Sequence, residues 1–205
     1  MQKISARVRV VSEQGAFPGT PDEKTKKDLK QLFQYVASHY PEPEGLVIKG
    51  AHGGIAIVAQ NPRFAQLLLE TTHCLIEQNA WGGQRVDLRE LAVQVVNLHY
   101  KCDLSFQAHL TVAKQAGLRV EQQAALPYWR TIGHMFSEEQ QLVIEFTNAV
   151  LGGDVPDELF GRVVERYGEK GAIEFAAIVG LFSCWAMILT ATKTQWDFGY
   201  GRPDK

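Results

Sequence analysis

The stretch that most constrains the fold is an uncharged, mostly apolar run near the C-terminus, from Phe175 to Ala191. It is shorter than the roughly 20 apolar residues that a membrane-spanning helix usually needs. Glu174 stands at its start, and the polar residues Ser183 and Thr190 lie inside it. Because the rest of the chain has the composition of an ordinary soluble domain, we expect this run to form a central core helix.

Helix start and stop signals recur along the rest of the chain. Thr20-Pro21-Asp22-Glu23 is a capping box with proline at the first helical position, and it predicts a helix to about His39. Further helix ends are predicted at Asn61-Pro62, Asp87-x-x-Glu90, Asp103 or Ser105, Ser137-x-x-Gln140, Gly152-Gly153 and Gly168, and a turn is predicted at Trp81-Gly82-Gly83-Gln84. Apart from a short extended piece at Ala6 to Val11, alternating strand patterns are missing, so the sequence predicts an all-α fold.

The chain has 205 residues, which suits one sizeable domain. We expect an N-terminal arm and helix over residues 1–45, a helical domain over residues 46–193 and a tail over residues 194–205. Because the tail is rich in aromatic residues and glycine, we expect it to pack across a neighbouring subunit or over a pocket mouth. Packing on its own core is the alternative.

Charge and cysteine content exclude several classes of protein. The 21 basic residues nearly balance the 23 acidic ones, and no basic stripe indicates a nucleic-acid partner. Cys74, Cys102 and Cys184 are few and far apart, which is not the pattern of a disulfide framework. The first residues lack the apolar segment of a signal peptide. These features predict a cytoplasmic protein with no membrane partner.

Reactive side chains gather between Glu90 and His109. The spacings of Cys102, Ser105 and His109 place a thiol, a hydroxyl and an imidazole on one face if one helix carries them all. Three of these residues also have a structural interpretation. Cys102 can be a packing residue, His109 a core histidine, and Glu90 the end of a capping box with Asp87. The spacing of His99 and Asp103 suits metal ligands, but a third ligand is missing, so we expect no metal site.

Several segments resemble the carboxymuconolactone decarboxylase family, which includes the AhpD-like alkylhydroperoxidases. The resemblance covers about Gly50 to Thr192. It rests on Gly53-Gly54-Ile55, Asn61-Pro62-Arg63-Phe64, Arg89-Glu90-Leu91-Ala92, Cys102 to His109 with Ala113 and Ala116-Gly117-Leu118, and Phe160-Gly161 with Tyr167 to Glu174. The peroxidase branch of the family carries Glu, eleven residues, Cys, two residues, Cys, three residues and His. Here Ser105 replaces the second cysteine, which is often Glu in the decarboxylase branch.

The resemblance implies an AhpD-like helical bundle that assembles as a dimer, trimer or hexamer. It implies His109, Glu90, Cys102 and Ser105 as catalytic residues. The residues expected to contact a substrate are His52, Gly53, His99, Phe106 and Trp185. It implies neither a metal nor a cofactor.

Ser105 cannot resolve a disulfide with Cys102, so the two-cysteine redox cycle is excluded within this motif. The leading hypothesis is a cofactor-free, decarboxylase-like enzyme that performs acid–base chemistry on a small carboxylated or lactone-type substrate. A one-cysteine, thiol-dependent peroxidase or reductase that uses Cys102 is the alternative. A non-catalytic helical binding or assembly protein is the third hypothesis.

Overall fold

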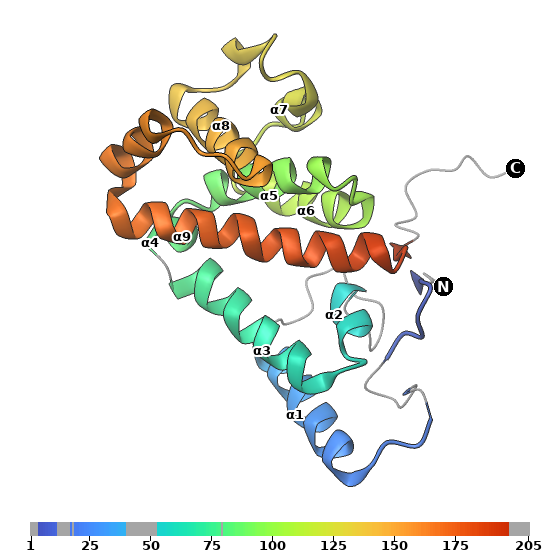
Figure 1. Ribbon diagram of the computed structural model, residues 1–205. Helices are drawn as coiled ribbons and strands as arrows, with labels where there is room; N and C mark the ends of the chain where they lie inside the picture. The colour runs from blue at the N-terminus through green and yellow to red at the C-terminus, as the bar shows by residue number, and fades with distance from the viewer. Residues whose placement is uncertain (1–3, 12–16, 18, 40–52, 79, 197–205) are drawn as a thin grey trace, which may run out of the picture. The chain divides into compact units, whose positions relative to one another are not determined.

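The computed structural model describes residues 4–11, 17, 19–39, 53–78 and 80–196 (Figure 1). Helices make up most of this part of the chain, and its strands are limited to one antiparallel pair of two residues each. The all-α class predicted from the sequence is therefore confirmed. The chain forms two compact units, Met1–Thr71 with Leu189–Lys205, and Thr72–Ile188. The division into arm, helical domain and tail stays a prediction.

The first unit contains α1 (Glu23–His39), α2 (Gly53–Val58), most of α3 (Pro62–His73) and the strands β1 (Ile4–Ser5) and β2 (Gln195–Trp196). Ile4 pairs with Trp196, and Ser5 pairs with Gln195. The described start of the tail therefore pairs with the N-terminal segment of its own chain, and residues 197–205 lie outside the described part. The expected extended piece is a strand only at Ile4–Ser5, ahead of Ala6.

Side-chain caps begin two helices of this unit. The Thr25 amide donates to Asp22 Oδ1 at 2.7 Å, so the cap of α1 is Asp22 and not Thr20. The Phe64 amide donates to Asn61 Oδ1 at 3.1 Å, as the Asn61-Pro62 signal predicts. The helix expected to begin near Leu46 is described only from Gly53, because residues 40–52 lie outside the described part.

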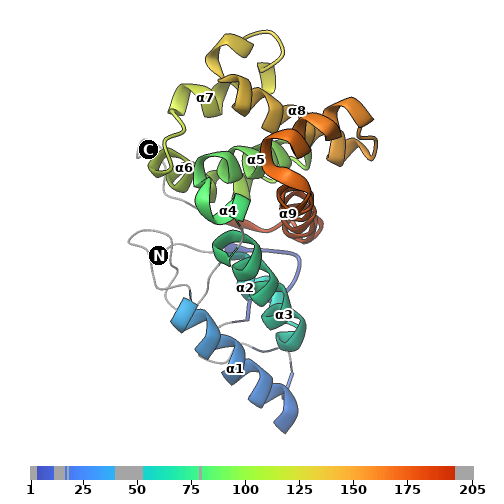
Figure 2. The same cartoon turned by 90° about the vertical axis from the view of Figure 1, so that its left-hand side faces the viewer.

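The second unit has α5 (Val86–His99) at its centre. The other elements are the π-helical turn η1 (Cys74–Gln78), α4 (Ala80–Gln84), α6 (Asp103–Gln115), α7 (Val120–Ala125), the short turns η2 (Leu126–Tyr128) and η3 (Gly133–Met135), α8 (Glu138–Gly152) and most of α9 (Asp157–Ala191). α5 packs against α6 and α8, and two views show α5 beside α6 (Figures 1 and 2). Every residue of α5 from Leu91 to Asn97 is buried. The most enclosed helix of this unit is thus α5.

α4 occupies the stretch predicted as a turn, so that prediction is wrong. A Cβ atom at Gly83 would lie 2.9 Å from the carbonyl oxygen of Glu77. Glycine therefore allows α4 to pack closely against η1 rather than to turn the chain.

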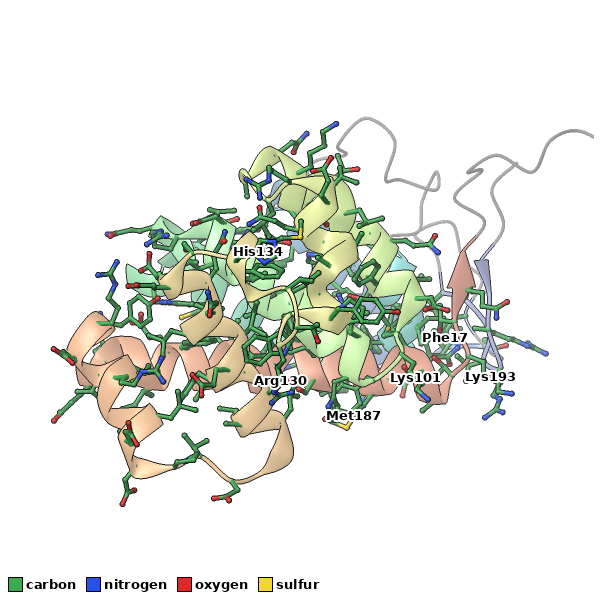
Figure 3. The ribbon with its side chains drawn as sticks, turned by 90° about the horizontal axis from the view of Figure 1, so that it is seen from above. Phe17, Lys101, Arg130, His134, Met187 and Lys193 are labelled. Atoms are coloured by element: carbon green, nitrogen blue, oxygen red, sulfur yellow. The ribbon has the colours of Figure 1, made fainter. Side chains whose placement is uncertain are left out.

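α9 contains the apolar run and buries only part of it. Phe175 and Ile178 are fully buried, whereas Met187 is 48% exposed, and Ile173, just before the run, is 67% exposed. The Met187 side chain stands away from the ribbon (Figure 3). α9 is the one helix of the described residues that is long and apolar enough to cross a membrane, and 56% of its most apolar window is buried.

Gly168 divides α9 into two parts, as the predicted stop indicated. Its φ of 72° and ψ of 168° interrupt the helix, and the first part turns away from the long second part (Figures 1 and 2). α8 begins with the predicted capping box of Ser137 and Gln140 and ends at Gly153 with φ 74°. These ends bring α8 and the first part of α9 into an αα-hairpin within the second unit.

Candidate active site

A buried carboxylate and an imidazole meet between α5 and α6. His109 Nδ1 lies 2.7 Å from Glu90 Oε2. Glu90 is 1% exposed, and it lies on α5 just before the buried stretch from Leu91 to Asn97. His109 lies on α6, and 24% of its side chain is exposed. Solvent therefore reaches the imidazole but not the carboxylate behind it.

Arg89 holds the second oxygen of the same carboxylate. Its Nε and Nη2 donate to Glu90 Oε1 at 3.0 and 2.9 Å, and its Nη1 donates to the carbonyl oxygen of Ile76 at 3.0 Å. Both oxygens of Glu90 thus accept charge-assisted hydrogen bonds. The resulting cluster of Arg89, Glu90 and His109 satisfies a buried charge that would be costly alone.

The pKa of Glu90 is lowered. Burial by itself raises this pKa, but the charge of His109, its hydrogen bond and the Arg89 guanidinium together outweigh burial. Glu90 is therefore ionised at neutral pH and acts as an acceptor only. It follows that His109 Nδ1 carries the proton of the 2.7 Å hydrogen bond.

This hydrogen bond fixes the tautomer and the orientation of the imidazole. The ring of His109 also meets the ring of Phe182 edge to face, with centroids 5.5 Å apart. Nε2 makes no hydrogen bond with the described residues. The arrangement leaves Nε2 as the atom that can take a proton from a ligand or give one to it.

Cys102 and Ser105 lie at the start of α6. Cys102 is the N-cap residue and is 4% exposed, and Ser105 is one turn before His109 and is also buried. The sequence favoured Asp103 or Ser105 as the cap of α6. The helix instead begins at Asp103, with Cys102 as its N-cap residue. Lys101, labelled in Figure 3, precedes the cap with φ 53°, a left-handed conformation that costs free energy for a residue other than glycine.

Buried amides brace α6 against α5 and α7. Gln94 Nε2 donates to the carbonyl oxygen of Phe106 at 3.1 Å and to Gln123 Oε1 at 3.3 Å. Asn97 Nδ2 donates to Gln94 Oε1 at 3.2 Å. All three amide residues are at most 2% exposed. Apart from Asn97 Oδ1, which has no partner among the described residues, these hydrogen bonds help to fix the position of the helix that carries His109.

The other residues expected at the site are dispersed. His52 lies outside the described residues, and Gly53 begins α2 in the first unit. His99 is exposed at the end of α5, where its ring meets Tyr100. Trp185 Nε1 donates to Thr72 Oγ1 at 3.2 Å. Phe106 shares α6 with His109 and is partly buried, so it is the nearest of this group along the chain.

The capping box predicted for Asp87 and Glu90 is wrong. α5 begins at Val86 after the N-cap residue Arg85, and no side chain caps it. Asp87 instead accepts from Arg85 Nε and Nη2 at 3.1 and 3.0 Å. The carboxylate of Glu90 is thereby left for Arg89 and His109.

Sequence reasoning missed two features of this unit. It gave Arg89 no role, although a basic residue next to a buried acid could have indicated one. It also missed a second polar cluster of Arg85, Glu139, Arg166 and Tyr167. Both described pockets adjoin this second cluster, and His109 lines neither of them. Among the described residues, His, Cys, Asp and Glu side chains do not gather in threes as metal ligands would.

Comparison with known proteins adds no relative. No protein-family model, curated protein or solved structure matches the chain.

Proposed function

We propose that the protein is a cofactor-free acid–base enzyme, similar to the carboxymuconolactone decarboxylases, that acts on a small carboxylated or lactone-type molecule. The observation that carries this proposal is the 2.7 Å hydrogen bond between buried, ionised Glu90 and His109. An imidazole that is oriented by a buried carboxylate and keeps one nitrogen toward solvent is suited to general acid–base catalysis. The proposal includes an AhpD-like arrangement of the helices, a homo-oligomer and a cytoplasmic setting.

His109 Nε2 would remove a proton from a carbon next to the substrate carbonyl. In a β,γ-unsaturated substrate, the electrons of that C–H bond would pass into a dienolate with its charge on the carbonyl oxygen, and the proton would return from Nε2 to the γ-carbon as the double bond moves into conjugation. In a decarboxylation, the carbon–carboxylate bond would instead break to give the enolate, carbon dioxide would leave, and protonated His109 would supply the proton. The substrate carbonyl is the electron sink in both cases.

Glu90 would stabilise the imidazolium that forms when Nε2 takes a proton. Its charge is available for this because Arg89 and His109 keep its pKa low despite burial. Arg89 would then be a positioning residue, since it reaches Glu90 and Ile76. Ser105, one turn before His109 on α6, would hydrogen-bond the substrate carbonyl.

Burial of Cys102 favours this proposal over a one-cysteine peroxidase. A reactive thiol needs access to its oxidant as well as a helix N-terminus that favours its anion. Cys102 has the second property, as the N-cap residue of α6, but it is only 4% exposed. We therefore assign it to packing beside the acid–base pair.

Deuterium exchange offers a test that does not require the natural substrate. The wild-type protein in D2O is mixed with a panel of small γ-lactones and keto acids, and NMR follows the loss of the proton next to the carbonyl. We expect catalysed exchange on at least one compound, and a loss of about 10²-fold or more in His109→Gln. Cys102→Ser should retain the exchange.

A matched histidine variant controls for general effects of the substitution. His134, labelled in Figure 3, is an exposed histidine on η3, so His134→Gln should behave as wild type. Exchange that survives in His109→Gln but disappears in Cys102→Ser would point to thiol chemistry instead. A wild-type protein that exchanges none of the panel would favour a non-catalytic binding protein.

A further inference from the structure

A second polar site lies in the Thr72–Ile188 unit, at the division of α9. A pocket of about 350 Å³ opens there, and its wall includes Trp81, Arg85, Glu139, Arg166, Tyr167 and Gly171. The residues come from α4, the start of α5, α8 and both parts of α9. Gly168 makes this possible because its left-handed backbone turns the two parts of α9 apart.

The one carboxylate in this wall is already matched by cations. Glu139 Oε1 accepts from Arg85 Nη1 at 3.0 Å, from Arg166 Nε at 3.0 Å and from Tyr167 Oη at 3.1 Å. Burial alone would raise the pKa of Glu139, but these partners lower it. Two guanidinium groups therefore face this carboxylate, and Arg85 also pairs with Asp87 at 3.0 Å.

Hydrogen-bond donors also outnumber acceptors in the wall. Arg166 binds Glu139 through Nε, and the described residues provide no acceptor for its two terminal nitrogens. Trp81 is 3% exposed, and its buried Nε1 has no hydrogen-bond partner among the described residues. A buried N–H group without an acceptor is rare in folded proteins.

The ring of Trp81 meets the ring of Tyr167 edge to face, with centroids 5.9 Å apart. Burial and the Glu139 carboxylate raise the pKa of Tyr167 to about 12, and the indole N–H opposes this rise. The two groups nevertheless fall outside hydrogen-bond geometry. The indole thus faces another wall residue of the pocket and still needs an acceptor.

The second part of α9 adds the N-terminus of a helix to the wall. It begins after Gly168, and Gly171 in its first turn lines the pocket. The N-terminus of a long helix presents unpaired N–H groups and a partial positive charge. A Cβ atom at Gly171 would lie 2.7 Å from Tyr167 Cβ, so only glycine fits this close turn.

We propose that this pocket binds a carboxylate or phosphate group of a small molecule, with Arg166 and the Trp81 indole as donors. The chemistry shared by the two groups is an oxyanion, which supplies the acceptors that the terminal nitrogens of Arg166 and the Trp81 indole lack. A neighbouring pocket of about 710 Å³ shares Glu139 and Arg166 with this wall and adds Glu138, Glu165 and Arg162. This second site is independent of the chemistry proposed for His109.

The Trp81 indole provides a direct test by NMR. The chain has four tryptophans, so a proton–nitrogen spectrum has four indole signals, and Trp81→Phe identifies the one from Trp81. If that variant does not fold, replacing Trp129, Trp185 and Trp196 in turn identifies it by elimination. Wild-type protein is titrated with inorganic phosphate and, separately, with acetate, at constant ionic strength.

We expect the Trp81 signal to shift with saturation while the other three stay in place. Arg166→Gln should weaken this binding about tenfold or more, because a charged hydrogen-bond donor is lost. Arg162→Gln is the matched control: Arg162 lies one turn earlier on α9 and pairs with Glu145. It should bind as wild type does.

The two anions separate the two possible sources. A shift with phosphate alone identifies a phosphate-bearing ligand, a shift with acetate alone identifies a carboxylate, and a shift with both supports a general oxyanion site. A linear shift without saturation would overturn the proposal. Equal binding by Arg166→Gln and wild type would overturn it as well.

Discussion

Two arginine–glutamate clusters in the same unit use the same chemistry at different depths. Glu90 is 1% exposed and is held by Arg89 and His109, whereas the Glu139 side chain is 17% exposed and is held by two arginines and a tyrosine. A buried charge depends fully on its partners, while a charge near solvent keeps part of its hydration. The buried cluster therefore suits fixed catalytic geometry, and the open cluster suits ligand exchange.

The largest difference should appear when each carboxylate is neutralised. Glu90→Gln leaves the Arg89 guanidinium buried without its counter-ion, and we expect a loss of about 3–5 kcal/mol in the free energy of unfolding. Glu139→Gln should cost about 1 kcal/mol or less, because solvent screens the arginines that remain. Urea unfolding followed by circular dichroism measures both values. Equal losses in the two variants would show that depth does not separate the clusters.

Acidification should also lower the free energy of unfolding, because it protonates Glu90. The pKa of folded Glu90 lies below its ordinary value of 4.5. Its stabilising contribution is therefore complete above pH about 4.5 and is lost as the pH falls through the lowered folded pKa. We expect the unfolding free energy of wild type to fall more steeply on acidification than that of Glu90→Gln. Parallel curves for the two proteins, measured by urea unfolding at a series of pH values, would contradict this.

The left-handed residue at the open cluster should be the next most sensitive position. Gly168 combines φ 72° with ψ 168°, a region that is essentially restricted to glycine. Gly168→Ala should cost about 1–3 kcal/mol and should also move the Trp81 indole signal, because the division of α9 shapes the pocket. Gly161→Ala is the control in the first part of α9, where a Cβ atom meets open space. It should stabilise the protein by about 0.5–1 kcal/mol.

Local sequence signals predicted where helices begin and end better than they predicted which side chains contact each other. Asn61, Ser137 with Gln140, and Gly168 act where the sequence placed them, because a cap or a left-handed residue depends on its immediate neighbours. Glu90 and His109 could be named as partners because a family resemblance suggested them. Arg89 was not named, since adjacent helix residues usually point in different directions, and here the long arginine side chain returns to Glu90.

Long-range pairs set the limit of what the sequence could predict. Arg85 and Glu139 are joined across α5 and α8, and charged residues are too common for such a pair to be chosen by pattern. The apolar run was expected to form the core, yet Ile173 and Met187 on the same helix are exposed. Hydrophobicity alone does not tell which side of a helix the rest of the molecule covers. The amides Gln94 and Gln123 were likewise missed, because burial of polar residues depends on partners from other helices.

The smallest expected effect is that of removing one hydroxyl from the open cluster. Tyr167→Phe deletes the donor at 3.1 Å from Glu139 Oε1, but both arginines stay. We expect a cost of about 1 kcal/mol, whereas Tyr128→Phe, at a 67% exposed position, should cost nothing measurable.

Alkaline titration separates this hydroxyl from the other tyrosines. Because the pKa of folded Tyr167 is raised from 10.0 to about 12, its contribution is complete below pH about 10 and is lost as the pH rises toward about 12. Phenolate absorbance in Tyr167→Phe should therefore lack the step at highest pH that wild type shows. If that step remains, Tyr167 does not depend on Glu139, and the open cluster is a pair of arginines on one acid. If it disappears while stability barely changes, the open cluster tolerates loss of a member as the buried cluster does not.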